Sequence, residues 1–186
     1  MIFRGQALAF LLVLCCAAPP AARPAAETVK ALVRDVGKDS AIATLYAGAD
    51  STSWDSLYRG VAVADTAWLA VYDLLAGHNN AEASEVLNDA LLDGLLASST
   101  AMLRWASKVR SPEAAAKALC GREHLTPDSA QEVAYLVAAR RAVAAVDAPD
   151  LAAVREHCLE QFASSLVGYD TIVPSNKRLK LTAPHK

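Results

Sequence analysis

Residues 111–120 read SPEAAAKALC, and this stretch gives the plainest indication of the fold. Pro112 suits the first position of a helix, because its fixed φ is already helical and an N–H there would have no partner. Glu113 follows at the positive end of the helix dipole, and the Ser111 hydroxyl is well placed to accept a hydrogen bond from a free backbone N–H. We therefore expect a helix that begins at Pro112 and is capped by Ser111.

The same kind of start recurs twice in the later part of the chain. TPDSAQEVAYL runs from Thr126 and APDLAAVREHCL runs from Ala148, and each carries a proline followed by an aspartate. Both stretches predict helices that begin at their prolines, Pro127 and Pro149.

Two stretches near the beginning of the chain end at a glycine. Residues 27–37, ETVKALVRDVG, predict a helix that stops at Gly37, whereas residues 40–48, SAIATLYAG, read as a short turn that ends at Gly48. The helical spacing of the first stretch is set by Val29, Leu32, Val33 and Val36.

The middle of the chain holds the most apolar helical pattern. Residues 53–77 predict one helix, or two helices broken between Gly60 and Asp65, and the pattern ends at Gly77.

Two more helices are expected directly after this stretch. Asn80 is a suitable cap for a helix over residues 81–98, and another helix follows within residues 99–109. The apolar face expected for the first comprises Val86, Leu87, Ala90, Leu91, Gly94 and Leu95. The face expected for the second comprises Met102, Leu103, Trp105, Ala106 and Val109.

Composition supports the helical interpretation. The chain has 40 alanines among 186 residues, and alanine has the highest helix propensity. No stretch of six residues alternates polar and apolar side chains between hairpin turns, so we expect no sheet. The sequence predicts an all-α fold, an irregular antiparallel helical bundle of about seven to nine helices with one disulfide. A short solenoid of helix pairs is the alternative.

The first 26 residues have the pattern of a signal peptide. Arg4 supplies the positive charge, ALAFLLVLCCAA at residues 7–18 supplies an apolar segment too short to span a bilayer, and small residues follow. We expect cleavage between residues 17 and 26.

A lipid anchor at Cys15 or Cys16 is the less favoured alternative for this segment. The residue before Cys15 is Leu14, where the bacterial lipoprotein pattern has a small residue. Either interpretation predicts export to the periplasm or the extracellular space, where disulfides form.

The remaining chain divides into a helical domain over residues 27–173 and a basic tail over residues 174–186 that we expect to be disordered. The domain holds 12 Lys and Arg against 20 Asp and Glu, a net charge of −8 with histidine neutral. This acidic domain argues against nucleic acid as a partner. We expect no transmembrane segment in the mature chain.

Cys120 and Cys158 are the two cysteines that remain after removal of the signal peptide, and we predict that they form a disulfide. His157 lies next to Cys158, but neighbouring helical residues point about 100° apart and do not serve one tetrahedral ion easily. No sequence signature of a thiol hydrolase surrounds either cysteine. We therefore expect no metal site and no catalytic cysteine.

Two further groups of side chains are candidates for a binding site. The aromatic residues Trp54, Trp68, Tyr72 and Trp105 would be able to line a ligand pocket, although core packing is the favoured interpretation. The polar candidates, for which a solvated helix face or salt bridges are favoured, are Asp65, Asp73, Asp89, Asp93, Arg140 and Arg141.

The sequence contains no recognised catalytic or nucleotide-binding motif, and we expect no cofactor. The favoured hypothesis is an exported, non-enzymatic protein that binds an unknown protein partner or has a structural role. The alternative is a carrier of a small apolar ligand in an aromatic-lined cavity between helices. An enzyme that uses the aspartate and histidine residues is the third and least favoured hypothesis.

Overall fold

The computed structural model describes residues 26–47, 51–121 and 130–172. Every regular element within these ranges is a helix, which confirms the predicted all-α fold. Residues 1–25 of the predicted signal peptide, the predicted basic tail, Gly48 and the helix start predicted at Thr126 and Pro127 lie outside the described residues.

The described residues form nine α-helices and one 3₁₀ turn, in agreement with the predicted bundle. The α-helices vary in length from eight residues in α6 to 21 in α9, which makes the bundle irregular. In chain order the elements are α1 (Ala26–Val36), α2 (Lys38–Ala47), α3 (Ser51–Ala62), α4 (Thr66–Leu75), α5 (Ala81–Ala97), α6 (Ser99–Ala106), α7 (Pro112–Cys120), α8 (Ala130–Ala144), η1 (Pro149–Leu151) and α9 (Ala152–Ile172).

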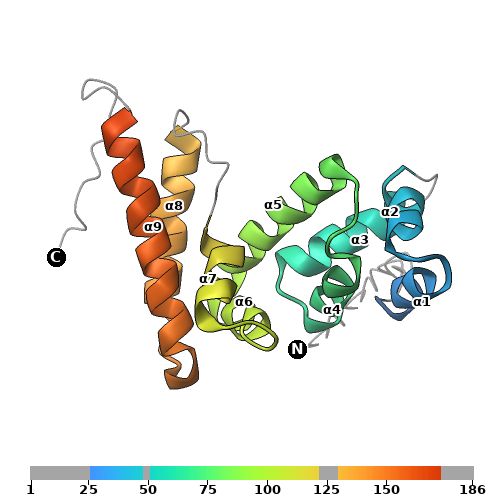
Figure 1. Cartoon of the computed structure of the whole chain (residues 1–186), viewed down its shortest axis with the longest axis horizontal. Helices are drawn as coiled ribbons and strands as arrows, with labels where there is room; N and C mark the ends of the chain where they lie inside the picture. Colours follow the sequence, from blue (N-terminus) through green and yellow to red (C-terminus); the bar gives the residue numbers. More distant parts are fainter. Residues whose placement is uncertain (1–25, 48–50, 122–129, 173–186) are drawn as a thin grey trace, which may run out of the picture.

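The helices follow one another along the long axis of the molecule in the order of the sequence (Figure 1). Helices α1 to α4 form one end, and α8 and α9 lie side by side at the other. Helix α5 runs between the two ends and contacts α3, α6, α7 and α8. One cluster of buried side chains extends from α1 to α9, so both ends share a core.

The predicted start at Ser111 is confirmed in detail. The Ser111 hydroxyl accepts a hydrogen bond from the Ala114 N–H over 3.3 Å, and Pro112 occupies the first helical position of α7. The start at Ala148 differs slightly, because Pro149 begins the 3₁₀ turn and α9 begins at Ala152. A tighter turn of this kind is common at the N-terminus of an α-helix.

The predicted break between Gly60 and Asp65 separates α3 from α4. The Asp65 carboxylate accepts hydrogen bonds from the N–H groups of Ala67, over 2.9 Å, and Trp68, over 3.2 Å, which caps α4. Asn80 caps α5 in the same way, because its side-chain oxygen accepts from the Ala83 N–H over 2.9 Å. These capping bonds satisfy backbone donors that the helices leave free.

Two local predictions were wrong. Residues 40–48 do not form a short turn, because α2 is a helix of ten residues that buries Ala41, Ile42 and Leu45. Gly37, with a φ of +78°, lets the chain turn and start this helix at once. Val109 is not on the buried face of α6, since that helix ends at Ala106 and Val109 is 76% exposed.

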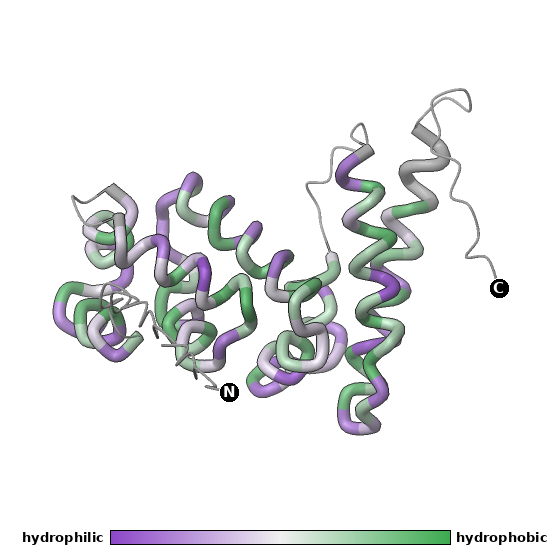
Figure 2. The backbone as a smooth tube through the Cα atoms, turned by 180° about the vertical axis from the view of Figure 1, so that it is seen from behind, coloured by the Kyte–Doolittle hydropathy of each residue, from purple (hydrophilic) through white to green (hydrophobic). Residues whose placement is uncertain are grey.

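Figure 2 shows that hydrophobic and hydrophilic positions alternate along α5, α8 and α9, as expected for helices with one buried face. On α5 this face was predicted well, because five of the six expected residues are buried and Val86 is partly buried. The opposite face of α5 stays accessible, and part of it belongs to the candidate site described next.

Candidate functional site

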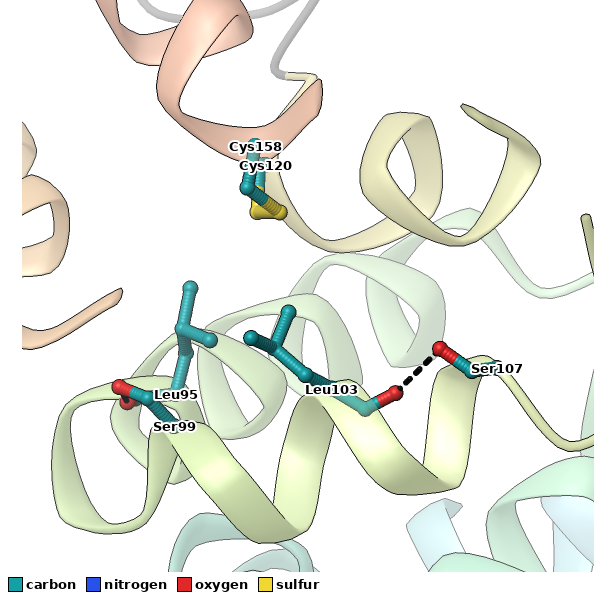
Figure 3. The surroundings of a disulfide bond; sticks show 6 residues. All are labelled: Leu95, Ser99, Leu103, Ser107, Cys120 and Cys158. Atoms are coloured by element: carbon teal, nitrogen blue, oxygen red, sulfur yellow. Dashed lines mark hydrogen bonds between the residues drawn. A yellow bond between two sulfur atoms is a disulfide. The ribbon is translucent and has the colours of Figure 1, made fainter. Parts of the chain in front are cut away.

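The predicted disulfide between Cys120 and Cys158 is present and joins the end of α7 to the second turn of α9. Its Cα atoms are 5.3 Å apart, and both residues are buried. Leu95 of α5 and Leu103 of α6 point their side chains toward it (Figure 3). The bond uses both thiols, so neither cysteine is a nucleophile in this state.

His157 is directed away from this bond. Its Nδ1 lies 3.2 Å from Oε2 of Glu160 on the outer part of α9. Among the described residues, no group of three or more histidine, cysteine or acidic side chains is arranged to hold a metal ion.

The four aromatic candidates do not form one group. Trp54 packs edge to face against Tyr46, with ring centroids 4.9 Å apart, at the contact of α2 and α3. Trp68 covers Gly60, at the contact of α3 and α4, so closely that a Cβ on Gly60 would overlap the ring. The other two candidates, Tyr72 and Trp105, pack edge to face at 5.6 Å between α4 and α6.

Polar contacts surround Trp105. Its Nε1 donates a hydrogen bond to Oδ2 of Asp73 over 2.9 Å, and the Arg110 guanidinium lies 5.4 Å from the centre of its ring. Arg110 also approaches Oδ1 of Asp73 at 4.0 Å. Burial raises the pKa of the neighbouring Tyr72. These contacts fasten α6 and the following turn to α4.

The other carboxylate candidates are separated as well. Asp65 caps α4, whereas Asp93 accepts a hydrogen bond of 2.8 Å from the Tyr58 hydroxyl. That bond is the main cause that raises the pKa of Tyr58 to about 12. Both arginine candidates, Arg140 and Arg141, are exposed on α8. The structure therefore does not bring the polar candidates together into one site.

An open groove lies between α5 and α7, with a volume of about 1140 Å³. Most of its wall on α5 consists of residues three or four positions apart, so they share one helix face. This wall comprises Ala81, Ser84, Glu85, Asn88, Asp89, Leu91 and Leu92. The opposite wall comprises Ala114, Lys117, Ala118, Leu119 and Gly121, and Glu132 of α8 also lines the groove.

The groove has an apolar floor and an acidic rim. Leu91 and Leu119 are buried, whereas Glu85 and Asp89 are exposed. Among the described lining residues, Glu85, Asp89 and Glu132 carry carboxylates and Lys117 carries an ammonium group, and Asp89, Glu132 and Lys117 each have an interaction partner.

A second, more open hollow adjoins the groove at Ala81, which lines both. Its lining includes two further acids, Asp39 and Glu82, beside Asn79. The Asp39 carboxylate accepts a hydrogen bond of 2.9 Å from the Asn79 N–H, which joins α2 to the turn before α5. Acidic side chains are thus present in this second hollow as well as in the groove.

Sequence reasoning missed this groove, and Asp89 is the one earlier candidate within its lining. The α5 wall has a clear helical spacing, but a polar face next to solvent has the same spacing as a polar face beside a groove. Only the position of α7 and α8 distinguishes the two, and that position is not a local property of the sequence.

Comparisons of the chain with protein-family models, with curated proteins and with solved structures found no match. Among the described helices, none is both long and apolar enough to cross a membrane.

Proposed function

We propose that this chain is an exported, non-enzymatic protein that binds another protein in the groove between α5 and α7. The observation that carries the proposal is the groove itself, whose volume of about 1140 Å³ is above the roughly 300 to 1,000 Å³ of typical small-molecule sites. An open channel between two helices suits a segment of a protein chain better than a compact ligand.

The disulfide supports the same proposal. Helix α7 forms one wall of the groove, and the bond at Cys120 ties this wall to Cys158 of α9. A wall held in place before binding reduces the conformational entropy lost when a partner docks. Disulfides persist mainly in oxidising compartments, which favours the export that the first 26 residues predict.

The carrier hypothesis stays a prediction from the sequence. Trp54, Trp68 and the pair of Tyr72 and Trp105 lie in three separate helix contacts, and none of them lines the groove. No observation among the described residues favours carriage over the binding of a protein.

Site-specific photo-crosslinking in the producing cells tests the proposal. A photoreactive amino acid at Asn88, which is exposed in the groove, should capture one defined partner that mass spectrometry identifies. The matched control places the same amino acid at Asp35, which is exposed on α1. The proposal fails if Asn88 captures nothing, or if Asp35 captures the same protein equally well.

Export has its own test. The chain recovered from the cell envelope or the medium should have lost between 17 and 26 residues by intact mass, and should contain no free thiol after denaturation without reductant. Recovery of the uncut chain from the cytoplasm alone would contradict export.

A further inference from the structure

The disulfide between Cys120 and Cys158 lies in the core, at the contact of α7 and α9. Cys120 is 1% exposed and Cys158 is 0% exposed. We propose that external thiols reach this bond only when the end of the bundle formed by α7, α8 and α9 opens, while α1 to α4 stay folded. The bond is therefore a redox device that one part of the fold opens and closes.

Thiol–disulfide exchange needs direct access to one of the two sulfur atoms. A thiolate of an external dithiol attacks the Sγ of one cysteine, forms a mixed disulfide and expels the other Sγ as a thiolate. The second thiol of the reductant then displaces the remaining cysteine and closes the oxidised reductant into a cyclic disulfide. Two electrons and two protons pass from the dithiol to Cys120 and Cys158.

Apolar packing blocks this attack in the folded protein. Leu95 of α5 and Leu103 of α6 point toward the bond, and both are buried (Figure 3). On α9, Val154 and Phe162 lie one turn before and one turn after Cys158, on the same buried face. A charged thiolate loses its hydration when it enters such an apolar site, which opposes attack. These side chains therefore have to separate before the sulfur atoms react.

The arrangement of the helices favours a local opening. Helix α9 makes its main contacts with α7, α8 and η1, and α8 and α9 lie side by side at the end opposite α1 (Figure 1). Val133 of α8 is buried against Leu166 of α9 in a second, small cluster, so these two helices have apolar contacts of their own. Opening one part of a structure costs less free energy than unfolding all of it, and exchange follows the cheaper route.

The same opening precedes formation of the bond by exchange, because the reverse reaction passes through the same mixed disulfide. The oxidant is then the disulfide of a thiol–disulfide oxidoreductase, which takes up the two electrons and two protons of the cysteines. It acts before α9 has packed against α7. Once α9 is packed, the bond is closed to reductants.

Timed reduction of the purified, oxidised protein by excess dithiothreitol tests the proposal. Samples are quenched with an alkylating reagent, and peptide mass spectrometry measures the free thiols of Cys120 and Cys158. Reduction in buffer should be at least about a hundredfold slower than in urea that unfolds the chain, because only the rare open state reacts. Oxidised glutathione, whose disulfide is unprotected, corrects for the effect of urea on the chemistry. Equal corrected rates in buffer and in urea would overturn the proposal.

A matched pair of valine variants separates local opening from complete unfolding. Val154 of α9 and Val29 of α1 are both 2% exposed, and urea unfolding checks that their truncation lowers global stability by similar amounts. Val154→Ala should accelerate reduction about tenfold, because it removes buried apolar surface around Cys158. Val29→Ala should change the rate by less than about twofold, because α1 stays folded in the open state. Equal acceleration by both variants, or none by Val154→Ala, would contradict the proposal.

The urea dependence of reduction in the wild type decides the question without a variant, in case either valine variant fails to fold. Below the unfolding transition, the logarithm of the corrected rate should rise with urea. Its slope should be at most about half of the slope that the m value for complete unfolding requires, because local opening exposes less surface. A slope equal to the global value would mean that complete unfolding is needed, and a slope of zero would mean that no helix separates. Either result rejects the proposal.

Discussion

The Trp105 Nε1 donates a hydrogen bond to Oδ2 of Asp73 over 2.9 Å, and this bond joins α6 to α4. The Trp105 side chain is buried except for 7% of its surface. It therefore combines a core position with a hydrogen bond between two helices that α5 separates in the sequence.

We expect Trp105→Ala to reduce the free energy of unfolding by about 3 to 5 kcal/mol, the usual cost of truncating a core tryptophan. Trp105→Phe keeps most of the apolar volume but loses the donor to Asp73, and should cost about 1 to 2 kcal/mol. Urea unfolding followed by circular dichroism measures both. Wild-type stability of both variants would favour the role in a ligand cavity over the role in the core.

The Trp68 side chain of α4 packs directly over Gly60 of α3. In an open helix, Gly→Ala stabilises by about 1 kcal/mol, but here a Cβ would overlap the indole ring. Since overpacking costs about 1 to 3 kcal/mol, Gly60→Ala should destabilise the protein. Adding Trp68→Leu should recover part of the loss that Gly60→Ala causes. A more stable Gly60→Ala variant would show that Trp68 moves away freely.

The helix boundaries were predictable because their causes are local. Ser111, Asp65 and Asn80 each cap a helix through a backbone N–H two or three residues away, so the sequence at that point contains the whole interaction. The end of α1 at Gly37 also has a local cause, because a residue without a side chain adopts a positive φ at little cost. The misreading of α2 has a different cause, because Ala41 and Ile42 are buried by contacts with other helices.

The candidate site was not predictable for the same reason. Trp54, Trp68 and Trp105 look like one set along the sequence, but each packs against a different helix contact. Asp89 looked like part of a solvated face, and it became a groove residue only because α7 lies opposite. Periodicity identifies which face of a helix is polar, but not which other helix faces it.

His78 provides a test by pH. Its Nδ1 accepts a hydrogen bond of 3.1 Å from the Asn80 N–H, which requires a neutral ring, and burial lowers its pKa. Asp39 opposes this shift and Lys38 adds to it. As the pH falls below about 6.5, the unfolded chain takes up the proton first, so the folded state loses stability. Above that pH both states are neutral at His78, and the contribution of His78 does not change with pH.

We therefore expect the free energy of unfolding to decrease more between pH 7.5 and 5.5 in the wild type than in His78→Gln, which does not titrate. Urea titrations at several pH values measure the difference, and NMR of the ring protons gives the pKa directly. The explanation is wrong if the two proteins have the same pH dependence, or if His78 titrates above 6.5.

The disulfide between Cys120 and Cys158 should contribute a large share of the stability. The bond closes a loop with a sequence separation of 38 residues, and loop-closure entropy assigns about 4 kcal/mol to it. The variant with Cys120→Ala and Cys158→Ala should lose about 2 to 5 kcal/mol, and the reduced wild type a similar amount. His157→Ala, next to the bond but turned toward Glu160, should cost less than about 1 kcal/mol. Urea unfolding followed by circular dichroism measures these differences, and a cysteine variant as stable as the oxidised wild type would contradict the prediction.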